Sequence, residues 1–421
     1  MGNVRLCIHR AADTIGGNCL EIVAPTGERL ILDAGRPLAT PDDEPTPTPP
    51  SLDITRPVMG VVLSHAHTDH CGLLSELPGS WPVYCGKATE QLVRLFAVLQ
   101  RTTMAQTFHT WGESGQAFSL GSFTITPFII DHSAFDAYAL KIEVGGKTIM
   151  YSGDFRAHGR KIARTKALMQ NPPPVVDALI LEGTNLIAEG ATSKPTPTES
   201  ELEERFVSLF RETRGRVFVS WSSSNIDRTV TLFRACKKSG RILVLDLFCM
   251  LVLIRLKEFA RLPQPDWSGG HMRAVVTSRM KQLTRRLGED NLVERLIGVN
   301  AAMSARKLAQ TPERWVIMAR GSLVDEYAGQ GVVPNADDAW IWSLWEGYLK
   351  MGSTQSMKDY FAPCRKICLH TSGHANQEML VRFATAMRPK MLIPVHVEEC
   401  RQFVKVFSDA IQLNNGQYLD I

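Results

Sequence analysis

The sequence lacks the cysteine pattern of a disulfide-linked secreted domain. Its nine cysteines are scattered and odd in number, and no two of them form a CxxC pair. Cysteines used in this way are typical of a reducing compartment. The first residues, MGNVRLCIHRAADTIGGN, also lack the apolar core of a secretory signal. We therefore expect a cytoplasmic protein.

The sequence also lacks a hydrophobic run that is long enough to span a membrane. One stretch, ILVLDLFCMLVLIRL at 242–256, is strongly apolar, but Asp246 and Arg255 interrupt it. A spanning helix needs about 20 consecutive apolar residues. We interpret the stretch as a buried strand followed by a buried helix, and we expect no membrane partner.

Strong charge and long-period repeats are absent as well. The formal net charge is +4, which permits a polyanionic partner without arguing for one, because nucleic-acid surfaces usually show denser clusters of basic residues. No repeat of solenoid period is visible. What the chain has is length. Its 421 residues exceed the usual size of one hydrophobic core, so we expect roughly two or three domains.

The first part of the chain alternates short apolar runs with Gly and Asp turns, which predicts β-strands. Carboxylate and imidazole side chains follow several of these runs. The pattern indicates an α/β fold with a site at one edge of a sheet. The predicted strands are 5–11, 19–25, 29–35, 59–65, 122–130, 137–144, 147–153 and 175–183, with helices at 71–76 and 88–100 and a surface loop at 41–53.

A Pro/Thr/Ser-rich stretch at 189–201 is the clearest candidate linker. After it the sequence changes to β-α-β alternation, which predicts a parallel sheet with crossover helices. Near the end of the chain, units of a strand followed by a ligand-type residue return. We therefore predict a first domain at 1–190, an inserted domain at 200–362, and a segment at 363–421 that completes the first domain.

Residues 64–72 read SHAHTDHCG and concentrate side chains that bind metal ions. Three imidazoles and a carboxylate within six residues have no packing rationale, whereas imidazole and carboxylate are the usual ligands of zinc. Six of the eleven histidines lie beside Asp or Glu after apolar runs. The candidate ligands are His65, His67, Asp69, His70, His132, Asp154, Glu182, His374 and His396.

These residues suffice for a site with two metal ions that share a bridging carboxylate. We predict that His65, His67 and His132 bind one ion and that Asp69, His70 and His396 bind the other. Asp154 is the natural bridge. The expected cofactors are two Zn²⁺ per chain, with Mn²⁺ as the alternative ion.

Plainer interpretations apply to some of the candidates. A single histidine after a strand, such as His132 or His396, is more often a hydrogen-bonded structural residue than a ligand. Asp33 either forms a turn before Gly35 or orients a metal-binding histidine from behind. Cys71 is interpreted as a small buried residue, because the cluster is already full.

The motifs LDAG, HAHTDHCG, DHSAFD and SGDF occur in the order of the four metal-site motifs of the metallo-β-lactamase superfamily, which the chain resembles. Glu182, TSGHA with His374, and IPVH with His396 resemble the three further motifs of its β-CASP nucleases. WSSSNIDR at 221–228 resembles another segment of that branch. Seven motifs in order cover essentially the whole chain.

The resemblance implies an αββα sandwich with an inserted β-CASP domain, two zinc ions, and hydrolysis of phosphodiester bonds. It also implies catalytic roles for Asp69, Asp154, Glu182 and His374, with the last two as a general-acid pair. RNA-processing members carry histidine at the position of His396, whereas DNA-directed members usually carry valine. The expected partner is therefore single-stranded RNA, and a homodimer or a complex with other proteins is also left open.

Other residues are candidates for contacts with substrate phosphates. These are Arg156, in a short basic run after Asp154, Ser372, before the glycine of TSGHA, and Ser223, which could instead belong to a helix cap. One departure from the family pattern is Val397, which stands where the family usually has glycine. The alternatives are a DNA nuclease of the same family, a small-molecule hydrolase of the lactonase or thioesterase type, and a non-catalytic scaffold.

Overall fold

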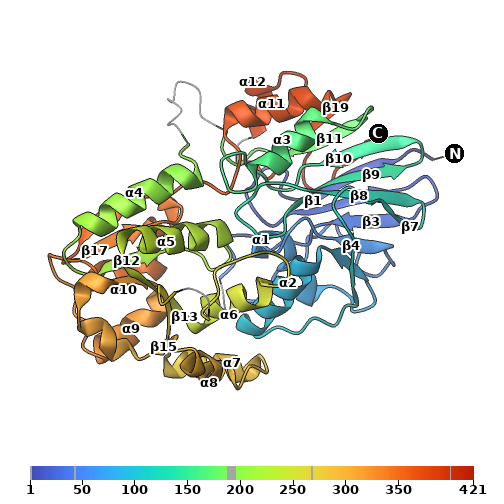
Figure 1. Ribbon diagram of the computed structural model, residues 1–421. Coiled ribbons are helices and arrows are strands. Elements are labelled where there is room, and N and C mark those ends of the chain that lie inside the picture. Colours follow the sequence, from blue (N-terminus) through green and yellow to red (C-terminus); the bar gives the residue numbers. More distant parts are fainter. Residues whose placement is uncertain (1, 42–43, 187–195, 267–268, 399) are drawn as a thin grey trace. The chain divides into compact units, whose positions relative to one another are not determined.

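The computed structural model describes residues 2–41, 44–186, 196–266, 269–398 and 400–421. The chain forms two compact units (Figure 1). Unit 1 comprises Met1–Thr196 and Gly373–Ile421, and unit 2 comprises Pro197–Ser372. Unit 2 is thus inserted into the chain of unit 1.

The first sheet of unit 1 follows the order β20-β1-β2-β3-β4-β5-β6. Its strands form because short runs of β-branched and apolar residues alternate with turns, and β2, β3 and β4 are buried along their whole length. From β3 to β6 neighbouring strands are parallel, so their carboxyl ends meet at one edge. The bounds are β1 Arg5–Arg10, β2 Cys19–Val23, β3 Arg29–Leu32, β4 Gly60–Val62, β5 Val83–Cys85, β6 Phe108–Thr110 and β20 Tyr418–Asp420.

The second sheet of unit 1 follows the order β19-β11-β10-β9-β8-β7. Strands β10, β11 and β19 are parallel to one another, so the residues that follow them also lie at one edge. The bounds are β7 Phe118–Leu120, β8 Phe123–Ile129, β9 Tyr138–Val144, β10 Lys147–Tyr151, β11 Ala178–Glu182 and β19 Met391–Val395.

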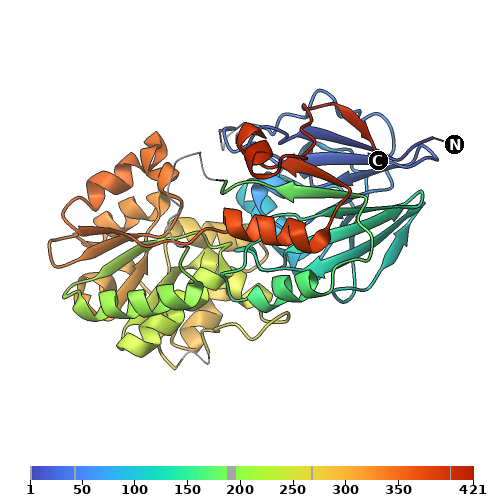
Figure 2. The same ribbon diagram turned by 90° about the horizontal axis from the view of Figure 1, so that it is seen from above.

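The segment after the insertion completes both sheets. Strand β19 pairs with β11, and strand β20 pairs with β1 at the start of the chain. The sheets lie face to face, with α3 (Ile162–Gln170) and α11 (Gln377–Met387) outside the second sheet and α2 (Lys87–Leu99) outside the first (Figures 1 and 2). This is the predicted αββα sandwich.

Buried apolar residues fix the outer helices on the second sheet. Phe383 of α11 contacts Phe155 with ring centroids 4.5 Å apart. The same core contains Leu168 of α3, Leu179 of β11 and Phe403 of α12 (Cys400–Val406). Burial of side chains of this size contributes about 1.5–3 kcal/mol each relative to exposure. The sheet edge that carries the site is therefore backed by a packed core.

Unit 2 contains one seven-stranded sheet in the order β15-β14-β13-β16-β12-β17-β18, and all its neighbouring strands are parallel. The strands are β12 Val217–Ser220, β13 Ile242–Asp246, β14 Met272–Val275, β15 Ala302–Met303, β16 Trp315–Met318, β17 Ala339–Trp342 and β18 Arg365–Cys368. The helices are α4 Glu199–Glu212, α5 Ile226–Ser239, α6 Leu247–Leu256, α7 Ser278–Arg286, α8 Leu292–Gly298, α9 Gly321–Gly329 and α10 Gln355–Tyr360.

The apolar stretch 242–256 forms β13 followed directly by α6, and Asp246 caps the helix by accepting from the Cys249 N–H. This agrees with the interpretation as a buried strand and a buried helix. In the part of the chain that the structure describes, no helix has the length and apolar character to cross a membrane.

Three details differ from the sequence-based expectations. Unit 2 extends to Ser372 rather than residue 362, because β18 pairs with β17 and not with a strand of unit 1. A short helix, α1 (Thr68–Cys71), begins inside the histidine cluster instead of after it, and a 3₁₀ turn (Leu74–Glu76) follows. In the predicted linker, 189–195 lies outside the described residues, and α4 begins at Glu199 with a capping box from Thr198.

Candidate metal centre

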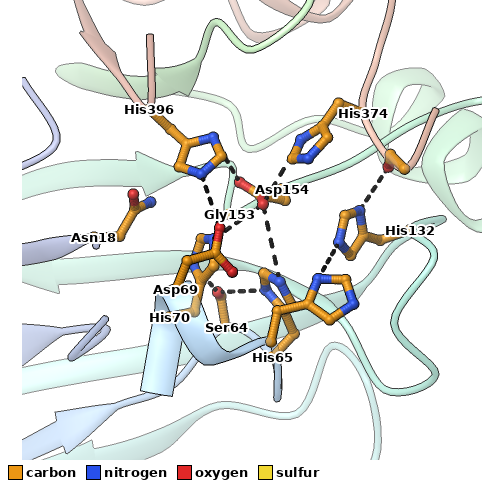
Figure 3. A network of polar contacts seen from close by, with 12 residues as sticks. Asn18, Ser64, His65, Asp69, His70, His132, Gly153, Asp154, His374 and His396 are labelled. Atoms are coloured by element: carbon orange, nitrogen blue, oxygen red, sulfur yellow. Dashed lines mark hydrogen bonds and ion pairs between the residues drawn. The ribbon is translucent and has the colours of Figure 1, made fainter. Parts of the chain in front are cut away.

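The candidate ligands of unit 1 come together at the ends of strands. His65 and His67 follow β4, Asp69 and His70 lie in α1, and Asp154 follows β10. Residues far along the chain join them: His132 after β8, Glu182 at the end of β11, His374 before α11, and His396 directly after β19. Figure 3 shows most of these side chains directed toward one another. The parallel strands explain the convergence, because their carboxyl ends share an edge.

The first cluster consists of three imidazoles, from His65, His67 and His132, with one nitrogen of each within 4.8 Å of the others. The Nε2 of His132 lies 3.1 Å from the Nδ1 of His67. Burial lowers the pKa of His67 to about 4 and lowers the pKa values of the other two well below the usual range, and neighbouring imidazoles add to the effect. The three rings are therefore neutral, which is the form that binds metal ions.

The second cluster combines Asp69, His70, Asp154 and His396. The Nε2 of His70 lies 2.9 Å from Oδ2 of Asp154, and the Nε2 of His396 lies 3.3 Å from Oδ2 of Asp69. The mixture of imidazole and carboxylate is the ligand set that zinc and similar divalent ions prefer.

Asp154 lies between the two clusters. Its Oδ2 contacts His70 and is 3.9 Å from the Nε2 of His65, which belongs to the first cluster. Burial alone would raise the pKa of Asp154, but the surrounding histidines, His396 first, lower it well below the usual range. Gly153 directly precedes Asp154 and has φ 52°. A Cβ at Gly153 would lie 2.8 Å from the Tyr138 carbonyl oxygen, so glycine lets the backbone place Asp154 here. Asp154 is thus placed as a bridge requires.

Four of the histidines are held by a hydrogen bond from Nδ1, the ring nitrogen that points away from the centre. His70 donates to Asp33 Oδ2 at 2.8 Å, and His132 donates to the Gly373 carbonyl oxygen at 2.6 Å. The hydroxyls of Ser64 and Thr184 donate to carboxylates and accept from His65 at 3.0 Å and from His396 at 2.8 Å. A proton on each Nδ1 leaves the Nε2 lone pair facing the centre.

Asp33 has further contacts that hold it behind His70. It accepts from the Ser64 N–H at 2.7 Å and from the Tyr151 hydroxyl at 2.6 Å, and Asn18 donates in turn to that hydroxyl at 3.0 Å. Asp33 itself has φ 57°, in the left-handed region that Asp adopts more often than most residues. Of the two roles that the sequence offered for Asp33, a turn or the orientation of a histidine, the contact with His70 supports the second.

The donor atoms fit a cation. Nε2 of His65 and Oδ1 of Asp154 are buried and have no hydrogen-bond partner among the described residues. The Nε2 of His70 also faces a carboxylate oxygen at 2.9 Å, a contact that needs a proton or a cation between the two atoms. Unsatisfied buried polar atoms carry a free-energy cost of about 1–3 kcal/mol each, which bound ions would remove.

His374 and Glu182 form a pair beside the second cluster. The Nδ1 of His374 lies 2.9 Å from Oε2 of Glu182 and 3.7 Å from Oδ2 of Asp154. Burial alone would lower the pKa of His374, but the two carboxylates, Glu182 first, raise it to about 9. The Phe155 N–H at 2.8 Å and the Thr184 hydroxyl at 2.7 Å fix the Glu182 carboxylate. These four residues thus hold a charged imidazole at the margin of the site.

The remaining candidate residues differ in burial and in the unit to which they belong. Arg156 is completely buried, and its Nε lies 3.6 Å from Asp131 Oδ1. This burial argues against a contact between Arg156 and substrate phosphates. Ser223 and Ser372 belong to unit 2, and their phosphate contacts stay predictions. Asn225, not a serine, caps the helix that follows Ser223, by accepting from the Arg228 N–H. Cys71 is buried, and burial raises the pKa of its thiol, which fits the interpretation as a packing residue.

Sequence reasoning missed Ser64, Thr184 and Gly373 as partners of the histidines. Thr184 lies two positions after Glu182 and Ser64 directly precedes His65, so their neighbourhood in the sequence was a usable signal. Gly373 acts through its backbone carbonyl oxygen, which any residue type would supply, and so left no signal.

Val397, which replaces the usual glycine of the family, packs into the core of unit 1. Its side chain is buried, and a Cβ built on Gly183 would lie 3.0 Å from it. Val397 is not among the described residues with positive φ, so its backbone does not require glycine. The glycine at this contact is Gly183, which leaves room for the Val397 side chain.

Residues 28–244, about half of the chain, match the family described as Beta-lactamase superfamily domain. The chain is 25% identical over 417 residues to Ribonuclease J of Mycobacterium tuberculosis, covering 94% of this chain and 69% of the relative. It is 23% identical over 373 residues to Ribonuclease J of Sinorhizobium meliloti, covering 84% of this chain and 62% of the relative.

For Ribonuclease J of Helicobacter pylori, the values are 24% identity over 406 residues, 91% of this chain and 54% of the relative. The chain thus spans between about half and two thirds of the length of these relatives. A crystal structure of a protein of unknown function from Enterococcus faecalis has the same fold, with a TM-score of 0.77, 18% identity and full coverage of both chains. The superfamily fold implies that the chain binds divalent metal ions, and the His/Asp clusters are the candidate ligands. The chain belongs to the beta-lactamase superfamily, as a metallo-β-lactamase-fold member of the β-CASP type.

Proposed function

We propose that this chain is a metal-dependent ribonuclease that hydrolyses RNA phosphodiester bonds with two zinc ions. The observation that carries the proposal is the geometry around Asp154. Two ligand clusters meet at this carboxylate, and the His374–Glu182 pair lies directly beside it. A site with two metal ions and a separate proton donor suits the displacement of an oxygen from a phosphate diester.

The relatives support the choice of substrate class. Three proteins that match more than four fifths of this chain are named Ribonuclease J. His396 is present at the position where RNA-processing members of the family carry histidine. Unit 2 also supports a polymeric substrate. A second unit can help to hold a nucleic-acid strand, whereas a small substrate does not need one.

In this proposal, His65, His67 and His132 hold one ion, and Asp69, His70 and His396 hold the other, with Asp154 shared between them. Divalent ions supply Lewis-acid stabilisation of charge on the phosphoryl group and ease the deprotonation of water. Zinc suits the histidine-rich set, and Mn²⁺ is the alternative. Asp33, Ser64, Thr184 and the Gly373 carbonyl orient four of the five imidazoles, those of His70, His65, His396 and His132, so these rings need little rearrangement to bind metal.

His374 is the proton donor in this proposal. Its Nδ1–H donates to Glu182 at 2.9 Å, so Nε2 of the imidazolium carries the proton that the leaving 3′-oxygen needs. Glu182 is completely buried and stabilises the charged form of the ring. General acid catalysis of this kind contributes about 10²–10⁴ in rate.

The other functions have less support. A DNA nuclease would use the same metal centre, and only His396 and the relatives argue for RNA. A lactonase or thioesterase would leave the His374–Glu182 pair and unit 2 without a role. A non-catalytic scaffold of this family would have lost ligands, whereas every predicted ligand is present here.

One experiment separates these functions. The purified chain is incubated with a 5′-labelled single-stranded RNA, bearing a 5′-monophosphate or triphosphate, with the matching DNA, and with lactone and thioester substrates. We expect RNA cleavage that requires metal and is abolished by His67→Ala. The variant His109→Ala, at an exposed histidine of β6, is the control and should cleave normally. Cleavage of DNA alone, or of a small substrate alone, would overturn the proposal.

A further inference from the structure

Unit 2 contains a pocket at the amino ends of its parallel strands, with a volume of about 330 Å³. Residues at or near the starts of β13, β14, β15 and β16 contribute to its wall, and the turns after α8 and before β16 supply the rest. The lining residues include Arg273, Lys307, Arg314, Asn300, Gln310 and Thr311. None of the residues assigned to the metal centre belongs to this unit.

The pocket is strongly cationic. Arg273, Lys307 and Arg314 line it, and none of the described lining residues is acidic. Among the described residues, none of these three side chains has an ion-pair partner. Burial and the nearby charge of Arg314 both lower the pKa of Arg273, as expected where like charges face each other. Three positive charges around one cavity repel each other, so the arrangement is stabilised by an anion between them.

The two guanidinium groups are held in place. Arg273 donates through Nη1 to the carbonyl oxygens of Gly270 at 3.2 Å and Met272 at 2.9 Å. The guanidinium of Arg314 lies over the ring of Trp315, 5.5 Å from its centroid. Side chains that are already ordered lose less entropy when they bind a ligand. The two groups are therefore prepared for hydrogen bonds to a small anion.

The rim of the pocket is polar and contains strained backbone. Asn300 and Thr311 have φ 52° and 46°. The conformation is unusual for a β-branched residue such as Thr311, and strain of this kind clusters at ligand sites. Trp315 donates through Nε1 to the Gln310 carbonyl oxygen at 2.7 Å, so its indole is already hydrogen-bonded and largely buried.

The position in the sheet distinguishes this pocket from the edge through which unit 2 is connected to unit 1. The entering chain at Pro197 accepts a hydrogen bond from the Thr371 hydroxyl at 2.6 Å, where the chain leaves. The leaving chain pairs through the Leu369 N–H with Trp342, the last residue of β17. Both connections are therefore at the carboxyl ends of the strands, whereas the pocket is at their amino ends.

We propose that this pocket is a second binding site, specific for the phosphate group of a small ligand such as a phosphate monoester or a pyrophosphate. Three cations balance the two or three negative charges of such a group, and arginine forks match phosphate oxygens in geometry. The volume is at the small end of the range for ligand pockets, about 300–1,000 Å³. A nucleic-acid strand fits less well, because it needs an extended groove with exposed aromatic faces.

Isothermal titration calorimetry on the full chain tests the proposal, with inorganic phosphate, pyrophosphate, adenosine diphosphate and adenosine as probes. The test variant is Lys307→Gln/Arg314→Gln, in which both residues are exposed and the fold should tolerate the change. The matched control is Arg279→Gln/Lys281→Gln, which removes the same charge from exposed positions of α7 outside the pocket. The metal centre is identical in all three proteins, so anion binding there cancels in the comparison.

We expect the phosphate-bearing probes, but not adenosine, to bind the wild-type chain and the control. Their Kd should rise about tenfold or more in the test variant, as expected when charge-assisted hydrogen bonds are lost. Equal affinity for pyrophosphate and the nucleotide means that the phosphate group alone is recognised, and much tighter binding of the nucleotide means that the nucleoside contributes.

Equal Kd values in the test and control variants would overturn the proposal, as would the absence of binding by every phosphate-bearing probe. Loss of RNA binding in the test variant without any binding of the small anions would identify the pocket as part of a nucleic-acid surface instead. Thermal melts of each variant verify folding. If the double variant is unfolded, Lys307→Gln against Lys281→Gln repeats the comparison.

Discussion

The Nδ1 of His374 lies 2.9 Å from Oε2 of Glu182, although 192 positions separate the two residues in the sequence. Unit 2 accounts for most of this separation, because the chain leaves unit 1 after Glu182 and returns at Gly373. The pair therefore forms only when the segment after the insertion has docked. His396 depends on the same return, since β19 pairs with β11, whose last residue is Glu182. The candidate metal centre and the His374–Glu182 pair are therefore completed by the same segment, Gly373–Ile421.

The first prediction separates proton donation by His374 from metal binding. In His374→Ala, we expect the single-turnover rate of RNA cleavage to fall by about 10²–10⁴, while zinc stays near two ions per chain by atomic emission. Glu182→Gln should show a smaller loss of rate, because the imidazole remains but its charge is no longer stabilised. His374 is also in a possible ligand group with Asp154, Glu182 and His396. Loss of one zinc in His374→Ala would therefore reassign it as a ligand.

The second prediction concerns Thr184, whose hydroxyl accepts from His396 and donates to Glu182. Thr184→Val removes the hydroxyl while keeping the shape of the side chain. We expect zinc affinity to fall by about 10–100-fold, the effect typical of lost orienting partners, and we expect little change in Tm of the metal-free protein. Thr184→Ser should restore the affinity, because it restores the hydroxyl. Competition with a chromogenic chelator gives the affinities, and equal values for all three proteins would contradict the role assigned to Thr184.

The third prediction is a pH dependence of stability that arises at Glu21, away from the metal centre. Burial alone would raise the pKa of Glu21, but the His9 imidazole 3.5 Å away, the hydrogen bond from the Tyr418 hydroxyl and the charge of Arg29 lower it to about 2 from an ordinary value of 4.5. A carboxyl group with a depressed pKa in the folded state stabilises the fold above its ordinary pKa. That stability is lost as the pH falls from about 4.5 to about 2.

Glu21→Gln should therefore lower the free energy of unfolding by about 3 kcal/mol near neutral pH, and the difference from wild type should shrink as the pH falls through this window. Urea unfolding followed by circular dichroism at several pH values measures both. The exposed residue Glu113 provides the control variant, Glu113→Gln, which should match wild type throughout. A difference that stays constant down to pH 2 would exclude the charge of Glu21 as the cause.

The sequence could group the candidate ligands at one place because strand ends can be read from it. Apolar runs that end in His or Asp place those residues at the carboxyl edge of a sheet, and this is how Asp154 and His396 could be assigned to one place. The β18 segment RKICLH was harder to assign, since it resembles the strand-then-ligand units of unit 1 but pairs with β17. Only tertiary pairing decides this.

Burial of charged residues was the other feature that the sequence did not reveal. Arg156 stands in a short basic run, SGDFRAHGRK, and such runs are usually solvated. In the structure its guanidinium is completely buried beside Asp131. The pair is 25 positions apart in the sequence, and no local pattern links the two residues. Similarly, the cations of the unit 2 pocket come from three separate elements, and none of them forms a charge run with another.

The last prediction concerns Val397, whose side chain fills the space that Gly183 leaves. Val397→Ala removes two buried methyl groups from the core of unit 1, where the surrounding residues include Phe403 and Leu181. We expect the free energy of unfolding to fall by about 2 kcal/mol, the range for large-to-small changes in a packed core. Val175→Ala, at a valine that is 51% exposed in the same unit, is the control and should change stability by less than about 0.5 kcal/mol. Urea unfolding of the two metal-free variants measures the difference. If Val397→Ala instead leaves stability unchanged but lowers zinc affinity, Val397 acts on the adjacent His396 rather than on the core.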